Sequence, residues 1–131
     1  MTQPVFLYAA LCALILIGLS LYVILGRATM RVGIGDGGNP QMLLRMRMHA
    51  NFVEYVPFAL VLIYFVQLAG YSVWVVHILG ISLVASRLAH VEGLRKSRNT
   101  SPGRFWGIVG TLLVILAAAL LVALGAFGIR F

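Results

Sequence analysis

The sequence predicts an all-α integral membrane protein, in which a single domain over residues 1–131 forms a four-transmembrane-helix bundle. Hydrophobic residues make up 62% of the chain and charged residues 10%, whereas a soluble domain is about half apolar and a quarter charged. The mean hydropathy is +1.03. Four apolar runs, each long enough to cross a hydrocarbon core of about 30 Å, predict helices at about 4–25, 40–69, 72–92 and 102–128.

The first apolar run, residues 4–25, contains no charged residue. No Lys or Arg precedes it, and no small-residue cleavage site follows it. These features favour a retained transmembrane helix over a signal peptide. Cys12 lies inside this run, where a small buried filler is its expected role.

The loop over residues 26–39 and the second run carry helix-start and helix-kink signals. Gly-Asp-Gly-Gly in the loop is not followed by a Lys-Ser/Thr pair, so we expect a flexible turn and no phosphate cradle. Asn39 and Pro40 are typical of an N-cap and a first helical residue. Pro57 lacks an amide N–H, which predicts a kink just beyond Glu54.

The third and fourth runs begin with similar signals. Ser72 is a candidate N-cap for the third helix, and Ser101 followed by Pro102 opens the fourth. His77 stands alone among apolar residues, so we expect a packing role for it. Tyr71 and Trp74 are predicted interface anchors, and small residues such as Gly107, Gly110 and Ala117–Ala119 suit close helix contact.

The loop charges predict the orientation in the bilayer. Residues 26–39 and 91–101 carry five of the eight Lys and Arg residues outside the second run, whereas the short second loop and the N-terminus carry none. The positive-inside rule then places both charged loops in the cytoplasm and both termini outside it. We expect a multi-pass protein of a bacterial inner (plasma) membrane, because no ER retention signal is visible. The cations cluster beside apolar spans, which argues against nucleic acid as a partner and for the lipid bilayer.

Polar residues cluster at the head of the second run. Arg47, Asn51 and Glu54 recur at i, i+4 and i+7, so they share one side of a helix, with Arg45 and His49 roughly opposite. Glu54 lies about 14 Å along the helix from Arg45, at hydrocarbon depth. An ionisable group at that depth indicates a functional site by default. The alternative is an Arg47–Glu54 bridge that only locks helix packing.

Polar residues of two other helices are expected at the same cytoplasmic level. Arg87 and His90 share a face at i, i+3, and Arg104 stands at the head of the fourth helix. A layer rich in arginine suits a carboxylate-bearing ligand, while Glu54 suits a ligand ammonium and Asn51 a backbone-like amide. The histidines fall at different depths or on different faces, so no metal site is predicted.

The second helix also carries a family signature. Arg47, His49, Asn51, Glu54, Tyr55 and Pro57 form an R-x-H-x-N-x-x-E-Y-x-P pattern. This pattern resembles the helix-two signature of the MAPEG family, the membrane-associated proteins of eicosanoid and glutathione metabolism. The four-span length, the short second loop and the Arg27-x-x-x-Arg31-Val end of the first helix agree, so the resemblance covers the whole chain.

The resemblance implies a homotrimer that binds glutathione, as a cosubstrate, between neighbouring subunits at the cytoplasmic level. It implies that the tripeptide is held by Arg47, Asn51, Glu54 and Tyr55, and that Arg27 and His49 reach a neighbour's ligand. Many members carry tyrosines near the end of helix three. Here Arg87 and His90 stand in that region, and they are candidates to complete the site.

The resemblance further implies an arginine near the start of helix four that stabilises the glutathione thiolate. Pro102-Gly-Arg104 resembles the opening of that helix, so Arg104 is the preferred candidate, with Arg95 and Arg98 as alternatives that spacing does not separate. A nearby cation in a low-dielectric site lowers the pKa of a thiol. The expected function is therefore a membrane glutathione-dependent transferase or peroxidase acting on lipophilic electrophiles or hydroperoxides.

Two other functions remain open from the sequence. The missing helix-three tyrosines favour a non-catalytic, lipid- or ligand-binding MAPEG-like scaffold. A small transporter or a packing-only membrane protein is the third hypothesis, although no internal repeat of the kind common in transporters is visible.

Overall fold

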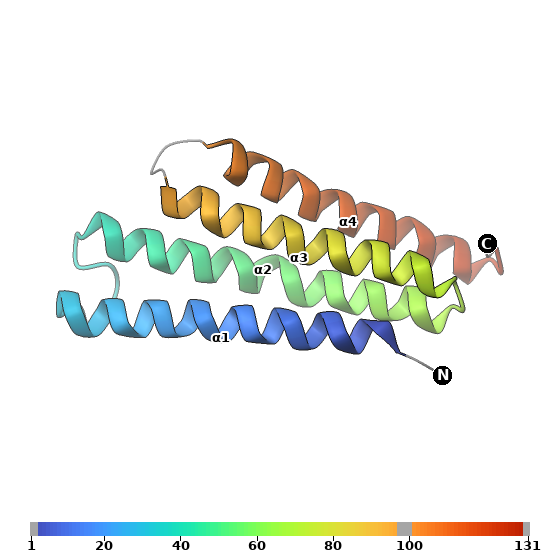
Figure 1. The fold of residues 1–131 in the computed structure, drawn as a ribbon, viewed down its shortest axis with the longest axis horizontal. Coiled ribbons are helices and arrows are strands. Elements are labelled where there is room, and N and C mark those ends of the chain that lie inside the picture. The colour runs from blue at the N-terminus through green and yellow to red at the C-terminus, as the bar shows by residue number, and fades with distance from the viewer. Residues whose placement is uncertain (1–2, 97–100, 130–131) are drawn as a thin grey trace.

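The computed structural model describes residues 3–96 and 101–129, and within them every regular element is an α-helix. The helices are α1 (Pro4–Met30), α2 (Pro40–Leu68), α3 (Val73–Lys96) and α4 (Pro102–Ala126). All four are long and apolar enough to cross a membrane. The predicted four-helix membrane architecture is therefore confirmed, and the helices run side by side in alternating directions (Figure 1).

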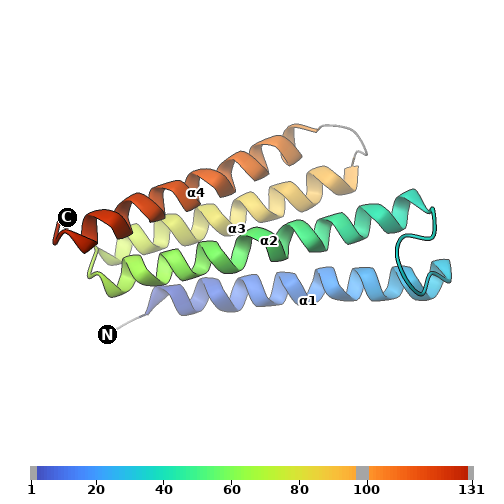
Figure 2. The same cartoon turned by 180° about the vertical axis from the view of Figure 1, so that it is seen from behind.

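The two middle helices organise the bundle. α2 and α3 each pack against the other three helices, whereas α1 and α4 lie on opposite sides of this pair and share no backbone contact within the described residues (Figures 1 and 2). The α1–α2 connection, the end of α3 and the start of α4 lie at one end of the bundle. The α2–α3 turn lies at the other end. Which end faces the cytoplasm stays a prediction.

Side-chain caps explain where three of the helices begin. Asn39 Oδ1 accepts hydrogen bonds from the backbone N–H groups of Gln41 and Met42, at 2.8 and 3.3 Å. Ser72 Oγ accepts from Trp74 N at 3.4 Å, and Ser101 Oγ accepts from Arg104 N at 3.3 Å. These bonds satisfy N–H groups that a helix start leaves without a partner. The predicted caps of α2, α3 and α4 are all present.

The first helix continues to Met30, past the end near residue 25 that the fall in hydrophobicity suggested. Hydrophobicity falls at Arg27, but the helix does not end there, because its backbone hydrogen bonds also form in the polar layer. Arg31 ends the helix in a left-handed conformation (φ 55°), and its N–H bonds to Arg27 O. The loop that follows turns through three glycines with positive φ, Gly35, Gly37 and Gly38, as expected for a glycine-rich turn.

Glycines on α4 allow a close approach to α3. A Cβ added at Gly107 would lie 2.6 Å from both the backbone N and the Cβ of His90. At Gly110 it would lie 2.2 Å from Ser86 Oγ. A larger residue at Gly107 would push the helices apart, whereas at Gly110 the Ser86 hydroxyl would have to move. The prediction that these glycines suit close helix contact is confirmed.

Cys12, His77 and Pro57 were also considered from the sequence, and they lie in α1, α3 and α2. Cys12 is buried, with 2% of its surface exposed. His77 Nδ1 lies 2.7 Å from the hydroxyl of Tyr8, in a hydrogen bond that ties α3 to α1 near the α2–α3 turn. α2 remains helical through Pro57, and the kink expected there stays a prediction.

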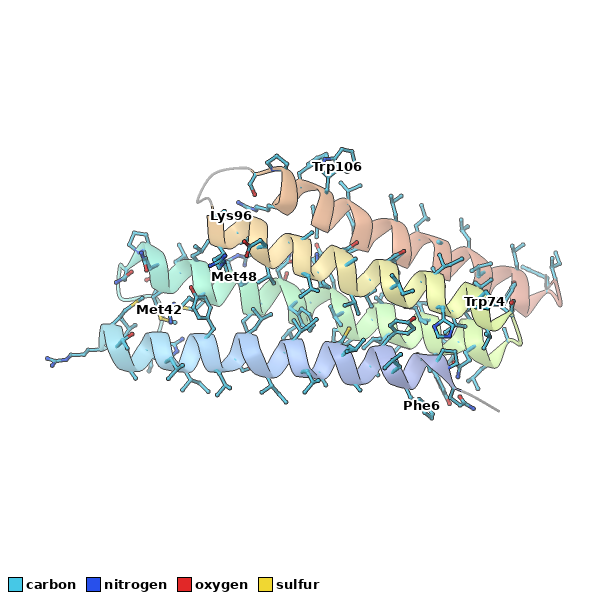
Figure 3. All side chains as sticks on the ribbon, in the orientation of Figure 1. Phe6, Met42, Met48, Trp74, Lys96 and Trp106 are labelled. Atoms are coloured by element: carbon cyan, nitrogen blue, oxygen red, sulfur yellow. The ribbon has the colours of Figure 1, made fainter. Side chains whose placement is uncertain are left out.

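The outer surface of the bundle is apolar. Large side chains such as Phe6, Leu14 and Leu120 are each more than half exposed. Trp74 and Trp106 are 72% and 65% exposed; Figure 3 shows Trp74 close to one end of the bundle and Trp106 in the first turns of α4. An apolar surface of this kind is suited to contact with lipid. The predicted partnership with a bilayer follows from these spans.

Candidate functional site

A cavity of about 300 Å³ lies between α2, α3 and α4, at the end of the bundle where α4 begins. We refer to it as the polar cavity. It brings together four residues that the sequence had singled out, Asn51, Tyr55, His90 and Arg104. The described residues that line it are Asn51, Tyr55, His90, Ser101, Arg104, Phe105 and Ile108.

The start of α4 gives one wall of the polar cavity a positive character. Ser101 caps the helix and its hydroxyl donates to Gly93 O at 2.9 Å, which fixes the first turn against α3. A helix N-terminus carries a partial positive charge. The side chain of Arg104 is exposed and makes no hydrogen bond to another described residue. Its guanidinium therefore remains available to an anion in the cavity.

Arg87 lies behind this wall and does not line the cavity. Its side chain is 1% exposed. Nη1 donates to Asn51 Oδ1 at 2.8 Å and Nη2 donates to Gly107 O at 3.2 Å, while Nε is buried without a partner. The ion pairs among the described residues involve Glu92 with Arg95 and Lys96. No described carboxylate therefore balances this buried cation.

The polar stripe expected along α2 divides between two faces. Asn51 and Tyr55 turn toward the polar cavity, whereas Arg47, Glu54 and Phe58 are exposed on the outward face of α2. Arg47 and Glu54 form no ion pair with each other or with another described residue. An intrachain Arg47–Glu54 bridge therefore does not account for them. Charged groups exposed at hydrocarbon depth are costly unless another molecule covers them.

Arg27 and His49 lie on the α1 side of the bundle. Arg27 Nη1 donates to the carbonyls of Val32, Gly33 and Gly35, at 3.4, 3.2 and 3.0 Å. His49 Nε2 lies 3.1 Å from Ser20 Oγ of α1. Since α1 does not reach α4, these two side chains do not meet the polar cavity of their own chain.

The alternatives to Arg104 are separated by the structure only in part. Arg95 Nε donates to Glu92 Oε2 at 2.8 Å, and this arginine does not line the polar cavity. Arg98 falls outside the described residues. Of the two candidates that the structure describes, Arg104 is the one that lines the cavity.

Sequence reasoning missed the apolar part of the lining. Phe105 and Ile108 belong to a long apolar run in which most side chains face lipid, and hydrophobicity does not distinguish the two environments. The available signal was spacing, because Ile108 stands four residues after Arg104 and so shares its face of the helix. Within the described residues, no three His, Cys, Asp or Glu side chains come together to hold a metal ion.

Four membrane-spanning helices, with a cavity at one end that Arg104 and several uncharged polar side chains line, define a multi-pass membrane protein. The chain belongs to the MAPEG family, which it matches over residues 5–124. Family membership relates it to membrane proteins of glutathione and eicosanoid metabolism. The chain is similar to "Inner membrane protein YecN" of Escherichia coli strain K12, with 41% identity over 115 residues, covering 85% of this chain and 86% of YecN. The protein of the same name from Escherichia coli O6:H1 matches to the same extent.

Proposed function

We propose that this protein is a membrane glutathione-dependent transferase or peroxidase that acts on lipophilic electrophiles or hydroperoxides. The observation that carries the proposal is the polar cavity, where Asn51 and Tyr55 of α2 face Arg104 of α4. Donor groups and a free guanidinium converge there in a chain whose family is linked to glutathione. The location is the bacterial inner membrane, as the name of YecN states for that relative.

The chemistry of the cavity supports an anionic, peptide-like ligand. A volume of about 300 Å³ falls at the small end of the range of about 300–1,000 Å³ that is typical of small-molecule sites. Arg104 suits a carboxylate or a thiolate, because a guanidinium donates to anions and stays charged. Glu54 lies one helical turn from Asn51, on the adjacent face of α2, where it suits the ligand's ammonium group.

Arg104 is the residue we propose for activation of the thiol. Its positive charge stabilises the thiolate over the thiol, which lowers the thiol pKa in a site of low dielectric. The thiolate sulfur then attacks the electrophilic carbon of the second substrate. A carbon–sulfur bond forms, and the leaving group departs with the electron pair of the bond that breaks.

The walls of the cavity support a lipophilic second substrate. Phe105 lines the cavity and is 57% exposed. Its ring lies 5.2 Å from that of Trp106, which is 65% exposed. An apolar surface therefore continues from the cavity to the lipid-facing side of α4, and a substrate dissolved in the bilayer can approach along it.

A homotrimer is part of the proposal. Arg47 and Glu54 are uncovered on the outward face of α2, and a second subunit packed there would remove them from lipid. Arg27 and His49 sit on the α1 side, away from their own cavity. In the proposed homotrimer they serve the ligand of a neighbouring subunit.

The test is a titration of glutathione into detergent-purified protein, followed by the ultraviolet absorbance of the thiolate. Wild type and Arg95→Ala should give a saturable thiolate signal, and Arg104→Ala should lose it while keeping its helical circular dichroism. Arg95→Ala is the matched control, because it removes an arginine that does not line the cavity. A thiolate signal that survives Arg104→Ala would refute the assigned role.

The second candidate is a binding protein without chemistry of its own. The cavity has two hydroxyl side chains, Tyr55 and Ser101, and the Ser101 hydroxyl is already engaged with Gly93 O. The described part of α3 contributes His90 to the lining and no hydroxyl. Saturable glutathione binding without a thiolate signal, reduced by Arg47→Ala, would favour this function over the enzyme.

A further inference from the structure

Arg87 is the largest fully buried side chain among the described residues, and its guanidinium bridges two helices. One end donates to Asn51 Oδ1 on α2 at 2.8 Å, and the other donates to Gly107 O on α4 at 3.2 Å. Thr111 Oγ1 donates to the same carbonyl at 2.9 Å. Gly107 permits this arrangement because any Cβ at this position would collide with His90. The guanidinium is therefore held in one plane between α2 and α4.

The chemistry of arginine determines which way the Asn51 amide faces. A guanidinium has five N–H donors and no acceptor, so the amide atom beside it must be the oxygen. The amide group is planar, with its nitrogen on the other branch. With Oδ1 engaged by Arg87, the N–H groups of Asn51 are left to face the polar cavity that this residue lines.

We infer that Arg87 is a positioning residue that orients Asn51 as a hydrogen-bond donor toward the polar cavity. This wall then accepts a carboxylate or carbonyl oxygen of the ligand and rejects a donor such as an ammonium group. The inference deepens the proposed function and rests on it where the ligand is glutathione. Arg87 acts through Asn51 and touches no ligand itself, since it does not line the cavity.

The substitution Asn51→Asp separates this role from packing. A carboxylate at this position pairs with the Arg87 guanidinium at least as well as the amide does. It presents acceptors to the cavity, however, where Asn51 presents donors. We expect Asn51→Asp to fold as well as wild type and to bind glutathione at least about tenfold more weakly, as expected for one lost hydrogen bond to a charged group.

Asn39→Asp is the matched control. It makes the same chemical change at the N-cap of α2, where Asp and Asn serve equally well. This variant should keep the wild-type affinity for glutathione. If Asn51→Asp also keeps it, the wall need not be a donor and the inference is overturned.

A double-mutant comparison tests whether Arg87 acts through Asn51. Arg87→Lys keeps a buried cation but loses the guanidinium whose two terminal nitrogens bond to Asn51 and to the Gly107 carbonyl. It should weaken glutathione binding about tenfold in the wild-type background, and it should have no further effect in an Asn51→Ala background. An equal loss in both backgrounds would show that Arg87 acts independently of Asn51, which contradicts a positioning role.

A ligand-free measurement distinguishes failure of this inference from failure of the proposed function. Protein labelled with ¹⁵N-asparagine reports the side-chain amides, and the Asn51→Ala spectrum assigns those of Asn51. Arg87→Lys should shift the Asn51 amide signals and leave those of Asn39 in place. Wild type that does not bind glutathione would refute the proposed function. If the Asn51 amide signals do not shift in Arg87→Lys, the positioning role is refuted, whatever the ligand is.

Discussion

Replacing Gly107 by alanine tests the close contact between α3 and α4 on which the polar cavity depends. The added Cβ would lie 2.6 Å from the backbone N and the Cβ of His90, where ordinary van der Waals contact begins at 3.4 Å. Both atoms are close to the α3 backbone, so no flexible side-chain tip can move aside. The helices must separate by nearly the missing 0.8 Å (3.4 minus 2.6).

The magnitude follows from three contributions. Overpacking costs about 1–3 kcal/mol, and loosening the Arg87–Gly107 hydrogen bond adds about 1 kcal/mol. Alanine regains about 0.5–1 kcal/mol over glycine as a helix former. We therefore expect Gly107→Ala to lower the free energy of unfolding by about 1–3 kcal/mol and to weaken glutathione binding as the cavity opens.

The assay is unfolding by sodium dodecyl sulfate in mixed micelles, followed by circular dichroism. Gly18→Ala is the matched control, because Gly18 is exposed on α1 and a Cβ there meets nothing within 4 Å. This variant should be neutral or slightly stabilised. If Gly107→Ala unfolds like Gly18→Ala, the α3–α4 contact is not as tight as described.

Three further predictions address other parts of the bundle. Asn39→Ala should lower the free energy of unfolding by about 1 kcal/mol in the same assay, because it removes the cap of α2, whereas Asn39→Ser should not. Tyr8→Phe should cost about 1 kcal/mol by deleting the bond to His77. Calorimetry should find its glutathione affinity unchanged, because this pair lies at the end opposite the polar cavity; a weakened affinity would contradict that separation. Cys12 should resist a water-soluble maleimide until the protein is unfolded, since its side chain is buried, and rapid labelling of folded protein would refute that burial.

The helices and their starts were predictable because they depend on local signals. Four apolar runs predicted four spans, and Asn39, Ser72 and Ser101 predicted where three helices begin. The end of α1 was less predictable from hydrophobicity, because a polar residue such as Arg27 can remain helical outside the hydrocarbon. Its guanidinium then bonds to loop carbonyls that follow the helix.

The sequence predicted which residue types form the site, but not which side chains of α2 face the cavity. Helical spacing placed Arg47, Asn51 and Glu54 on one side of α2. Side chains on an arc of that width nevertheless face different surroundings in the bundle. Whether a residue at its edge meets α4 or stays uncovered depends on the packing angle between helices. The position of α4 depends on contacts made elsewhere, such as the close approach of Gly107 to His90 of α3, which no local pattern along α2 reports.

The same limit applies to Arg87. Arg87 stands three residues before His90, and this spacing suggested that it contacts the ligand. Its side chain is 1% exposed, however, and does not line the cavity. The side chain reaches Asn51 of α2 and the Gly107 carbonyl of α4 because α3 packs against both helices. Only the packed bundle shows that Arg87 binds Asn51, while the side chain of Arg104 lines the cavity without a hydrogen bond to another described residue.

The most direct test of the central claim is to fill the polar cavity without touching its polar groups and to measure glutathione binding by calorimetry. Ile108→Trp places a large ring in the cavity, and Leu116→Trp makes a comparable change on an exposed face of α4, where Leu116 is 56% exposed. We predict at least about a tenfold loss of affinity for Ile108→Trp, equal to about 1.4 kcal/mol, and wild-type affinity for Leu116→Trp. Equal affinity in the two variants would show that glutathione does not bind in this cavity and would contradict the account.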